Sequence, residues 1–171
     1  MTNKVYFATA NLGDAIGVEL PRELKSHATT NQSLLAWALL LEKYRNVYNE
    51  DLPMVSFLSS GKPVIDGGHI SVSHSESLVA VCFSKTAVVG VDIELIKDTV
   101  PQNVSKFLDE KNPPEFYKKW TEREAVIKAK NYSALKKSVE KEFVGITEIV
   151  TLNEKAFSLS VYGENAQFIK V

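Results

Sequence analysis

The order in which helical and strand patterns alternate along the chain is the feature that most constrains its fold. A short apolar strand pattern at residues 5–8 precedes a long amphipathic pattern that runs to about Tyr48. Thr29 and Gln32 stand at capping-box spacing and predict the start of a helix there. Apolar residues then recur three and four positions apart, which is the period of one buried helix face. The positions expected in that face are Leu34, Leu35, Ala38 and Leu41, with Trp37 in the core.

Short strands are expected after this helix. An apolar stretch at 54–58 ends in the turn Gly61-Lys62-Pro63. Three segments rich in β-branched residues follow, separated by tight polar links, at residues 70–73, 78–83 and 87–93. Because short links suit hairpins better than crossovers, we expect the three to pair as an antiparallel meander.

The second half of the chain repeats this order. A helix is predicted from about Pro114 to Lys130, and closing strands are predicted at 143–151, 156–161 and 167–171. The repeat predicts an α+β fold with two pseudo-symmetric lobes, each a small, mostly antiparallel sheet packed on a long helix. The expected lobes are residues 1–85 and 86–171, packed as one unit in a monomer with pseudo-twofold symmetry. A site is expected in the cleft between them.

Charge and composition exclude several classes of function. The net charge of −1 over 171 residues provides no basic field for nucleic acid. The single cysteine, Cys82, lies in an apolar run and is expected to be a buried, inert thiol. The N-terminal residues lack the apolar core of a signal peptide, and no stretch approaches the ~20 apolar residues of a membrane span. We therefore expect a cytoplasmic protein with no nucleic-acid or membrane partner.

Two carboxylates stand at the end of a predicted strand in Gly90-Val91-Asp92-Ile93-Glu94. Residues two apart on a strand point to the same face, so Asp92 and Glu94 can act together. Like charges this close repel each other unless a cation or a proton lies between them. The alternative is a strand that runs out into solvent with ordinary acidic residues.

A second cluster lies on the predicted helix, where Trp120, Glu124 and Lys128 recur at intervals of four and form one stripe. Arg123 stands beside it. The alternative is an exposed Glu124–Lys128 ion pair with Trp120 as a core anchor. If Glu124 faces the strand carboxylates, the three form an all-oxygen site of the kind that suits Mg²⁺. The two cations would then neutralise a bound pyrophosphate.

A third group could contact phosphate. His74, with Ser73 and Ser75 on either side, stands at a strand end and could donate hydrogen bonds to a phosphate, although a histidine satisfied within a turn is an equal alternative. Gly61 and Lys62 could offer a backbone amide and an ammonium to another phosphate, or form a plain turn.

Taken in order, four motifs within residues 61–130 resemble one family. They are Gly61-Lys62-Pro63, Ser71-Val72-Ser73-His74-Ser75, Gly90-Val91-Asp92-Ile93-Glu94 and Phe116-Tyr117-Lys118-Lys119-Trp120-Thr121-Glu122-Arg123-Glu124-Ala125-Val126-Ile127-Lys128-Ala129. The chain resembles the 4′-phosphopantetheinyl transferases, specifically the two-lobed surfactin-synthetase-activating type. The resemblance implies transfer of 4′-phosphopantetheine from coenzyme A to a serine of an apo acyl or peptidyl carrier protein, with release of 3′,5′-ADP.

Residue roles follow from the resemblance position by position. It implies that Asp92, Glu94 and Glu124 hold Mg²⁺, that Glu124 is the base for the carrier serine, and that Lys128 stabilises the pyrophosphate. Coenzyme A itself would contact residues of the other motifs. These are Gly61, Lys62, Ser73, His74 and Arg123, with Lys62 near the nucleotide 3′-phosphate.

The chain departs from the family pattern at several points. Arg123 replaces the usual lysine. The first long helix starts without the usual basic residues, a role that Lys25 or His27 could take. The loop after Lys128 has no glycine, although Asn131 could adopt the left-handed conformation there.

Two alternatives to the transferase stay open: a metal-dependent pyrophosphate hydrolase, and a non-catalytic module that binds coenzyme A or docks on a synthase. The sequence does not distinguish a carrier of fatty-acid, polyketide or peptide synthesis. Four lysines could attract an acidic carrier or form a solvated face. They are Lys118, Lys119, Lys136 and Lys137.

Overall fold

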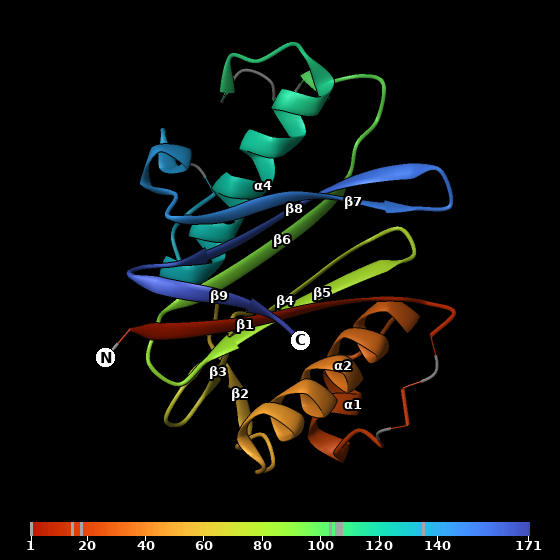
Figure 1. Ribbon diagram of the computed structural model, residues 1–171, viewed down its shortest axis with the longest axis vertical. Helices are drawn as coiled ribbons and strands as arrows, with labels where there is room; N and C mark the ends of the chain where they lie inside the picture. Colours follow the sequence, from red (N-terminus) through yellow and green to blue (C-terminus); the bar gives the residue numbers. More distant parts are fainter. Residues whose placement is uncertain (1, 15, 18, 103, 105–107, 135) are drawn as a thin grey trace.

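The computed structural model describes residues 2–14, 16–17, 19–102, 104, 108–134 and 136–171. Its strands form the middle of the molecule, with one long helix on each outer side (Figure 1). Figure 1 shows α2 at one end and α4 at the other, and two sheets lie between them. The predicted α+β class is confirmed.

The first sheet has the strand order β4-β5-β1-β9. Its strands are β1 (Asn3–Asn11), β4 (His69–Ser75), β5 (Leu78–Ser84) and β9 (Ala166–Lys170). The helices α1 (Arg22–His27) and α2 (Asn31–Tyr48) pack on one face of it through an apolar core that includes Trp37 and Leu40. A two-stranded sheet of β2 (Val55–Phe57) and β3 (Pro63–Ile65) lies beside β4.

The second sheet has the strand order β6-β8-β7. Its strands are β6 (Val89–Leu95), β7 (Gly145–Leu152) and β8 (Lys155–Gly163). Helix α4 (Pro113–Lys130) covers one face, and a 3₁₀ helix η1 (Val139–Glu142) follows it. Gly90 allows the helix to approach closely, because a Cβ there would lie 2.0 Å from the backbone oxygen of Ala125.

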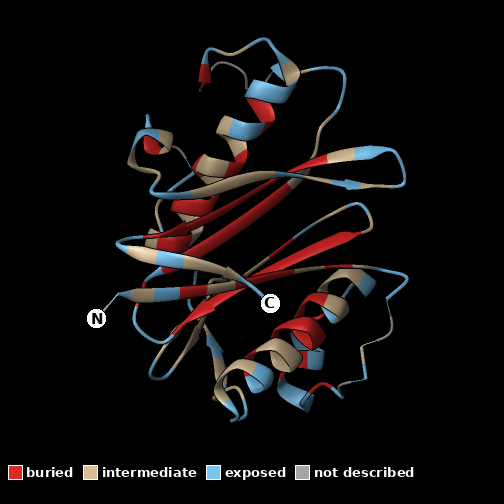
Figure 2. Ribbon diagram, viewed as in Figure 1, coloured by how far each residue is buried: buried red, intermediate tan, exposed pale blue. Residues whose placement is uncertain are grey.

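The two sheets pack face to face around a shared apolar core. Alternate residues of the strands that line it supply this core, as the period of two requires. Val91 and Ile93 of β6 face this core, and Phe7 of β1 and Cys82 of β5 meet them from the other sheet. Figure 2 shows β5 and most of β6 as continuously buried strands in the middle of the molecule. The expected burial of Cys82 is confirmed, and burial raises the pKa of its thiol.

The other face of β6 turns toward α4 and presents Gly90, Asp92 and Glu94. Because Val89, Val91 and Ile93 are buried on the apolar face of β6, the register of the strand cannot slip without exposing them. The two carboxylates are therefore held on the helix side of the sheet, as the sequence predicts.

Strand pairing differs from the predicted meander. β4 and β5 form the expected antiparallel pair. β6, however, pairs with β8 in the other sheet and not with β5. The short link between β5 and β6 is used to cross from one sheet to the next, and both strands contribute to the core between the sheets.

Three further details differ from the prediction. The cap of α2 lies one residue later than predicted, because Thr30 Oγ1 accepts from the backbone N–H of Ser33 at 3.1 Å and Ser33 Oγ accepts from the backbone N–H of Thr30 at 3.0 Å. Leu34, expected in the buried face, is 38% exposed. The last strand, β9, runs parallel to β1 and so belongs to the sheet of the first half of the chain.

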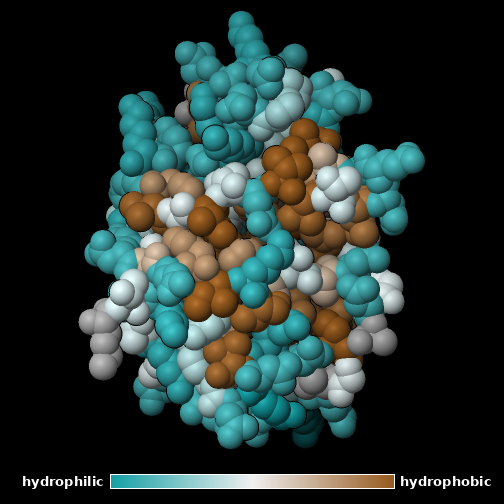
Figure 3. Space-filling view, in the orientation of Figure 1, coloured by the Kyte–Doolittle hydropathy of each residue, from teal (hydrophilic) through white to brown (hydrophobic). Residues whose placement is uncertain are grey.

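The outer surface mixes polar and apolar residues. The face in Figure 3 has apolar residues over its middle, where β1 and β9 lie in Figure 1, surrounded by polar side chains. Ile149 of β7 is 56% exposed. Within the described residues, neither long helix is apolar enough to cross a membrane.

Candidate functional site

The predicted strand carboxylates and the predicted stripe of Trp120, Glu124 and Lys128 line one pocket of about 490 Å³ between α2, β4, β6 and α4. We call it the carboxylate pocket. The residues that line it are His27, Ser33, Ala36, Trp37, Phe57, Gly61, Pro63, Val72, Ser73, His74, Asp92, Glu94, Trp120, Glu124 and Lys128. Its walls therefore come from parts of the chain up to about a hundred residues apart, brought together by the meeting of the two sheets.

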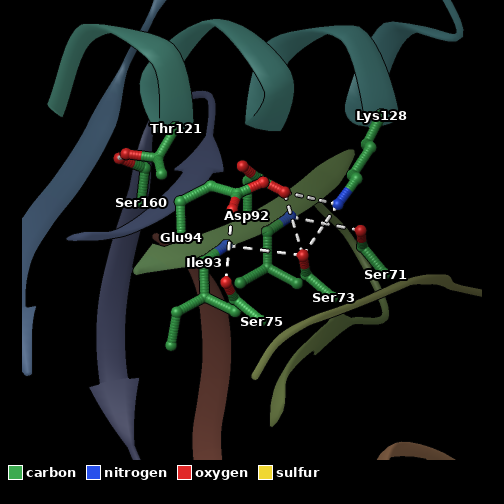
Figure 4. Close-up of polar contacts among 10 residues, drawn as sticks. Ser71, Ser73, Ser75, Asp92, Ile93, Glu94, Thr121, Lys128 and Ser160 are labelled. Carbon is green, nitrogen blue, oxygen red and sulfur yellow. Dashed lines mark hydrogen bonds and ion pairs between the residues drawn. The ribbon is translucent and has the colours of Figure 1, made fainter. Parts of the chain in front are cut away.

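Asp92 is the most deeply buried of the acidic residues in this pocket, with 4% of its surface exposed. One oxygen, Oδ1, accepts from Lys128 Nζ at 2.7 Å and from Ser73 Oγ at 2.9 Å (Figure 4). The other oxygen, Oδ2, is buried and has no hydrogen-bond partner among the described residues. A buried carboxylate oxygen without a partner is costly, so this atom is a candidate ligand for a cation.

The negative charge of Asp92 affects the pKa of both Glu94 and Glu124. Burial and then the neighbouring Asp92 raise the pKa of Glu94 to about 7, although Ser75 Oγ donates to its Oε2 at 3.2 Å. Burial and Asp92 also raise the pKa of Glu124. Burial is the larger cause of both shifts, because it disfavours the charged carboxylate, and repulsion by the Asp92 charge adds to it. The pocket thus has more carboxylate than its own cations neutralise.

Lys128 supplies positive charge on the opposite wall. It belongs to the stripe of α4 that was predicted from the sequence, and its side chain is about one third exposed. Trp120, four residues before Glu124, also lines the pocket and stacks on Phe116 with a ring-centroid separation of 6.1 Å. The predicted stripe therefore faces the carboxylates of β6.

A second pocket of about 320 Å³ continues from the first and shares Gly61, Pro63, Val72 and Lys128 with it. We call it the Lys62 pocket. Lys62 Nζ donates to the backbone oxygen of Ala129 near the end of α4, where helix carbonyls lack helical partners. Burial lowers the pKa of Lys62. Gly61 has a φ of 83° and forms the turn that presents this lysine.

The end of α4 is joined to the same turn. Asn131 caps the helix in the left-handed conformation, with φ 54° and ψ 41°, and confirms the prediction made for it. Ser60 Oγ donates to Asn131 Oδ1 at 2.7 Å. An asparagine therefore replaces glycine at the helix end and also anchors the 60–62 turn.

His74 and His27 lie at the edge of the carboxylate pocket. Partial burial and the charge of Lys128 lower the pKa of His74, so its imidazole is neutral at pH 7 and can donate one hydrogen bond to a phosphate. His27 stacks on Phe57 at a centroid separation of 4.0 Å. Of the two residues considered as substitutes for the missing basic pair, His27 lines the pocket, while Lys25 pairs with Glu19 at 3.1 Å.

Arg123 does not line either pocket, and the predicted phosphate contact is at odds with its position. Only 1% of it is exposed, and its guanidinium donates to the backbone oxygens of Ala134 at 2.7 Å and Lys136 at 2.5 Å. It also lies 3.6 Å from Glu140. Successive helix residues are about 100° apart, so a side chain next to Glu124 points away from the stripe. Arg123 holds the segment after α4.

Ser73 is at the site but in another role than predicted. Its hydroxyl donates to Asp92 and accepts from Lys128 Nζ at 2.9 Å and from the backbone N–H of Ile93 at 3.4 Å. A hydroxyl has one donor and two acceptor positions, and all three are used. It has no capacity left for a phosphate of coenzyme A.

The sequence did not predict that Trp37 and Phe57 line the carboxylate pocket. Trp37 is in the core as predicted, with 4% exposed, yet it also contributes to the pocket wall with Phe57, whose ring it meets edge-on at 5.9 Å. Only the position of Phe57 in an isolated apolar stretch before the Gly61 turn could have indicated this.

Two of the four lysines considered for carrier docking are paired within the chain. Lys119 lies 2.7 Å from Glu110, and Lys136 lies 2.8 Å from Glu142. These pairs reduce the free positive charge that an acidic partner would meet.

Comparison with known proteins does not assign the chain: no protein-family model and no curated protein sequence matches it. Among the described residues, no three histidine, cysteine, aspartate or glutamate side chains are grouped closely enough to hold a metal ion as they stand.

Proposed function

We propose that the chain is a Mg²⁺-dependent 4′-phosphopantetheinyl transferase that modifies a serine of an apo acyl or peptidyl carrier protein. The observation that supports this most is Asp92 Oδ2, buried without a partner in a pocket that Glu94, Glu124 and Lys128 also line. The four motifs that resemble the family all contribute to the two joined pockets. A helix and a sheet from each half of the chain are compatible with the two-lobed fold of that family.

The residues present fit a magnesium ion. The donors would be carboxylate oxygens of Asp92, Glu94 and Glu124, and magnesium takes such donors while keeping places for water and phosphate oxygens. The side chain of Glu124 has three rotatable bonds, so its carboxylate can turn toward Asp92 Oδ2 and join the two carboxylates of β6. When bound, the ion would neutralise charge on the pyrophosphate.

The remaining chemistry requires positioning and proton transfer. The hydroxyl oxygen of the carrier serine bonds to the β-phosphorus of coenzyme A, and the bond from that phosphorus to the bridging oxygen breaks. The leaving group is 3′,5′-ADP. Glu124, whose pKa is raised, is suited to take the serine proton. Lys128 lies where its ammonium can stabilise the leaving phosphate.

Recognition of the nucleotide end is assigned to the Lys62 pocket and the pocket edge. Gly61 and Lys62 would approach one phosphate and His74 another. The arrangement has no need of a protein nucleophile, which agrees with phosphoryl transfer by positioning and charge stabilisation.

The test is intact-mass measurement of several apo-carrier domains after incubation with coenzyme A, Mg²⁺ and the chain. We expect a phosphopantetheine-sized gain on the carrier serine, abolished without Mg²⁺ and in Asp92→Ala and Glu124→Gln. Glu122→Gln is the matched control, because Glu122 lies on the same helix and accepts from Thr147 Oγ1 at 2.9 Å outside the pocket. It should retain transfer.

The same experiment separates the two alternatives. Cleavage of coenzyme A without any carrier would point to a pyrophosphate hydrolase. Coenzyme A that binds in calorimetry, with no gain on any carrier and no cleavage, would point to a binding or docking module. Either result would overturn the proposed transfer.

A further inference from the structure

Strands β4 and β6 lie side by side without the backbone pairing that joins neighbours within a sheet. The contacts come instead from three alternate serines of β4. Ser71 Oγ accepts from the backbone N–H of Val91 at 3.1 Å, Ser73 Oγ from that of Ile93 at 3.4 Å and Ser75 Oγ from that of Leu95 at 3.0 Å. The serines therefore satisfy the outer edge of β6, whose backbone donors would otherwise be buried without acceptors.

The three hydroxyls differ in where they donate their own proton. Ser73 donates to Asp92 Oδ1 at 2.9 Å, and Ser75 donates to Glu94 Oε2 at 3.2 Å. Figure 4 shows Ser73 and Lys128 both meeting Asp92, while Ser71 lies farther along the strand edge. Ser73 and Ser75 thus each contact β6 twice, once through a backbone N–H and once through the carboxylate of the preceding residue.

We propose that Ser73 and Ser75 are positioning residues that hold Asp92 and Glu94 in the orientation that a bound divalent cation requires, whereas Ser71 only joins the strands. Holding Asp92 through Oδ1 keeps its other oxygen, Oδ2, directed away from the serine and available as a ligand. Side-chain hydrogen bonds to ligating carboxylates act in this way in metal sites generally. The inference rests on the proposed function for the identity of the cation site.

Ser71 makes the matched control possible. Its hydroxyl serves the same backbone edge as that of Ser73, and both side chains are buried, with 4% and 7% exposed. Removal of either hydroxyl therefore takes the acceptor from one backbone N–H of β6. Of these two serines, only Ser73 also donates to a carboxylate of the site, so only its removal frees Asp92 Oδ1 from a serine contact.

The first test measures Mn²⁺ affinity, used as a spectroscopic probe for Mg²⁺, by titration followed with electron paramagnetic resonance. We expect Ser73→Ala to weaken Mn²⁺ binding by roughly 10- to 100-fold and Ser71→Ala to change it by less than about threefold. Ser75→Ala should give an intermediate loss, and Ser73→Thr should restore most of the affinity. An equal loss in Ser71→Ala and Ser73→Ala would overturn the inference.

The second test needs no metal or substrate. Urea unfolding midpoints in the presence of a chelator are compared for two double-mutant cycles, Ser73→Ala with Asp92→Asn and Ser71→Ala with Asp92→Asn. We expect the Ser73 and Asp92 effects to be non-additive and the Ser71 and Asp92 effects to add. Additive effects for Ser73 and Asp92 would overturn the positioning role whatever the transfer assay shows.

The two proposals can fail separately. If the wild-type chain modifies no carrier but its Mn²⁺ affinity still falls only in the Ser73 and Ser75 variants, the transferase proposal fails and the positioning roles stand. If the wild-type chain does not bind Mn²⁺, both fail. If transfer occurs and all three serine variants bind Mn²⁺ alike, the positioning roles alone fail.

Discussion

Lys128 Nζ lies 2.7 Å from Asp92 Oδ1, and the two side chains differ sharply in exposure, 32% for the lysine and 5% for the aspartate. The ammonium can be hydrated if its partner is lost, but the carboxylate cannot. The lysine thus partly neutralises the centre of the site and leaves one oxygen, Oδ2, to a second cation.

The first prediction concerns this asymmetry. Lys128→Met leaves a buried carboxylate without its cation and should lower the free energy of unfolding by about 2 kcal/mol, less than the 3–5 kcal/mol of a fully buried pair because this pair is partly hydrated. Asp92→Asn should lower the free energy of unfolding by less, because the lysine that it leaves unpaired can be hydrated. Urea unfolding in chelator measures both. Added Mg²⁺ should raise the midpoint of Lys128→Met. An equal cost for the two variants would contradict the burial argument.

The second prediction concerns pH. The pKa of Glu94 is raised from 4.5 to about 7, so the folded chain binds this proton more tightly than the unfolded chain. The contribution of Glu94 to the free energy of unfolding is therefore fully present below pH 4.5 and is lost as the pH rises through about 7. In chelator, the unfolding midpoint of the wild type should therefore fall across this window relative to Glu94→Gln.

Mg²⁺ should reverse that trend, because a metal ion competes with the proton for the carboxylate. Its binding should strengthen as the pH rises through about 7 in the wild type. Calorimetric titrations at several pH values measure this, with Glu122→Gln as the variant that should behave like the wild type. Affinity independent of pH would argue against Glu94 as a ligand.

The third prediction concerns the approach of α4 to β6. In Gly90→Ala the new Cβ would lie 2.0 Å from the backbone oxygen of Ala125, so the helix has to move. We expect a loss of about 3 kcal/mol or more in the free energy of unfolding, at the upper end for overpacking since the clash is with backbone. Mn²⁺ affinity should fall too, because Glu124 and Lys128 move with the helix.

Gly17→Ala is the control for that substitution, since no atom lies within 4 Å of a Cβ at Gly17. It should leave both the unfolding midpoint and Mn²⁺ affinity close to those of the wild type. A Gly90→Ala chain with unchanged metal affinity would mean that the helix position does not determine the site.

The fourth prediction separates Arg123 from the chemistry. Arg123→Met removes a buried cation that donates to two backbone oxygens after α4, and should lower the free energy of unfolding by about 2–3 kcal/mol. Coenzyme A affinity, measured by calorimetry well below the melting temperature, should stay within about twofold since no pocket residue is altered. A large loss of affinity with little loss of stability would restore the phosphate role.

Short-range periodicity in the amino-acid sequence is enough to predict the α+β class and two parts of the site. The period of two places Asp92 and Glu94 on one face of β6, and the period near four places Trp120, Glu124 and Lys128 on one stripe of α4. Both follow from backbone geometry alone. The α+β class follows from the same patterns, because each helix needs an apolar sheet to cover.

Periodicity does not predict which strand edges and which helix faces meet, because those contacts join residues far apart in the chain. The meander was wrong because β6 satisfies one edge with β8 and the other with serine hydroxyls of β4, a choice that depends on residues far apart in the chain. The alternate serines at 71, 73 and 75 were visible in the sequence, but hydroxyls can serve a phosphate as well as a backbone amide. Only the position of β6 decides between them. The predicted phosphate contact of Arg123 was wrong for a similar reason, because the direction of its side chain depends on where the segment after α4 packs.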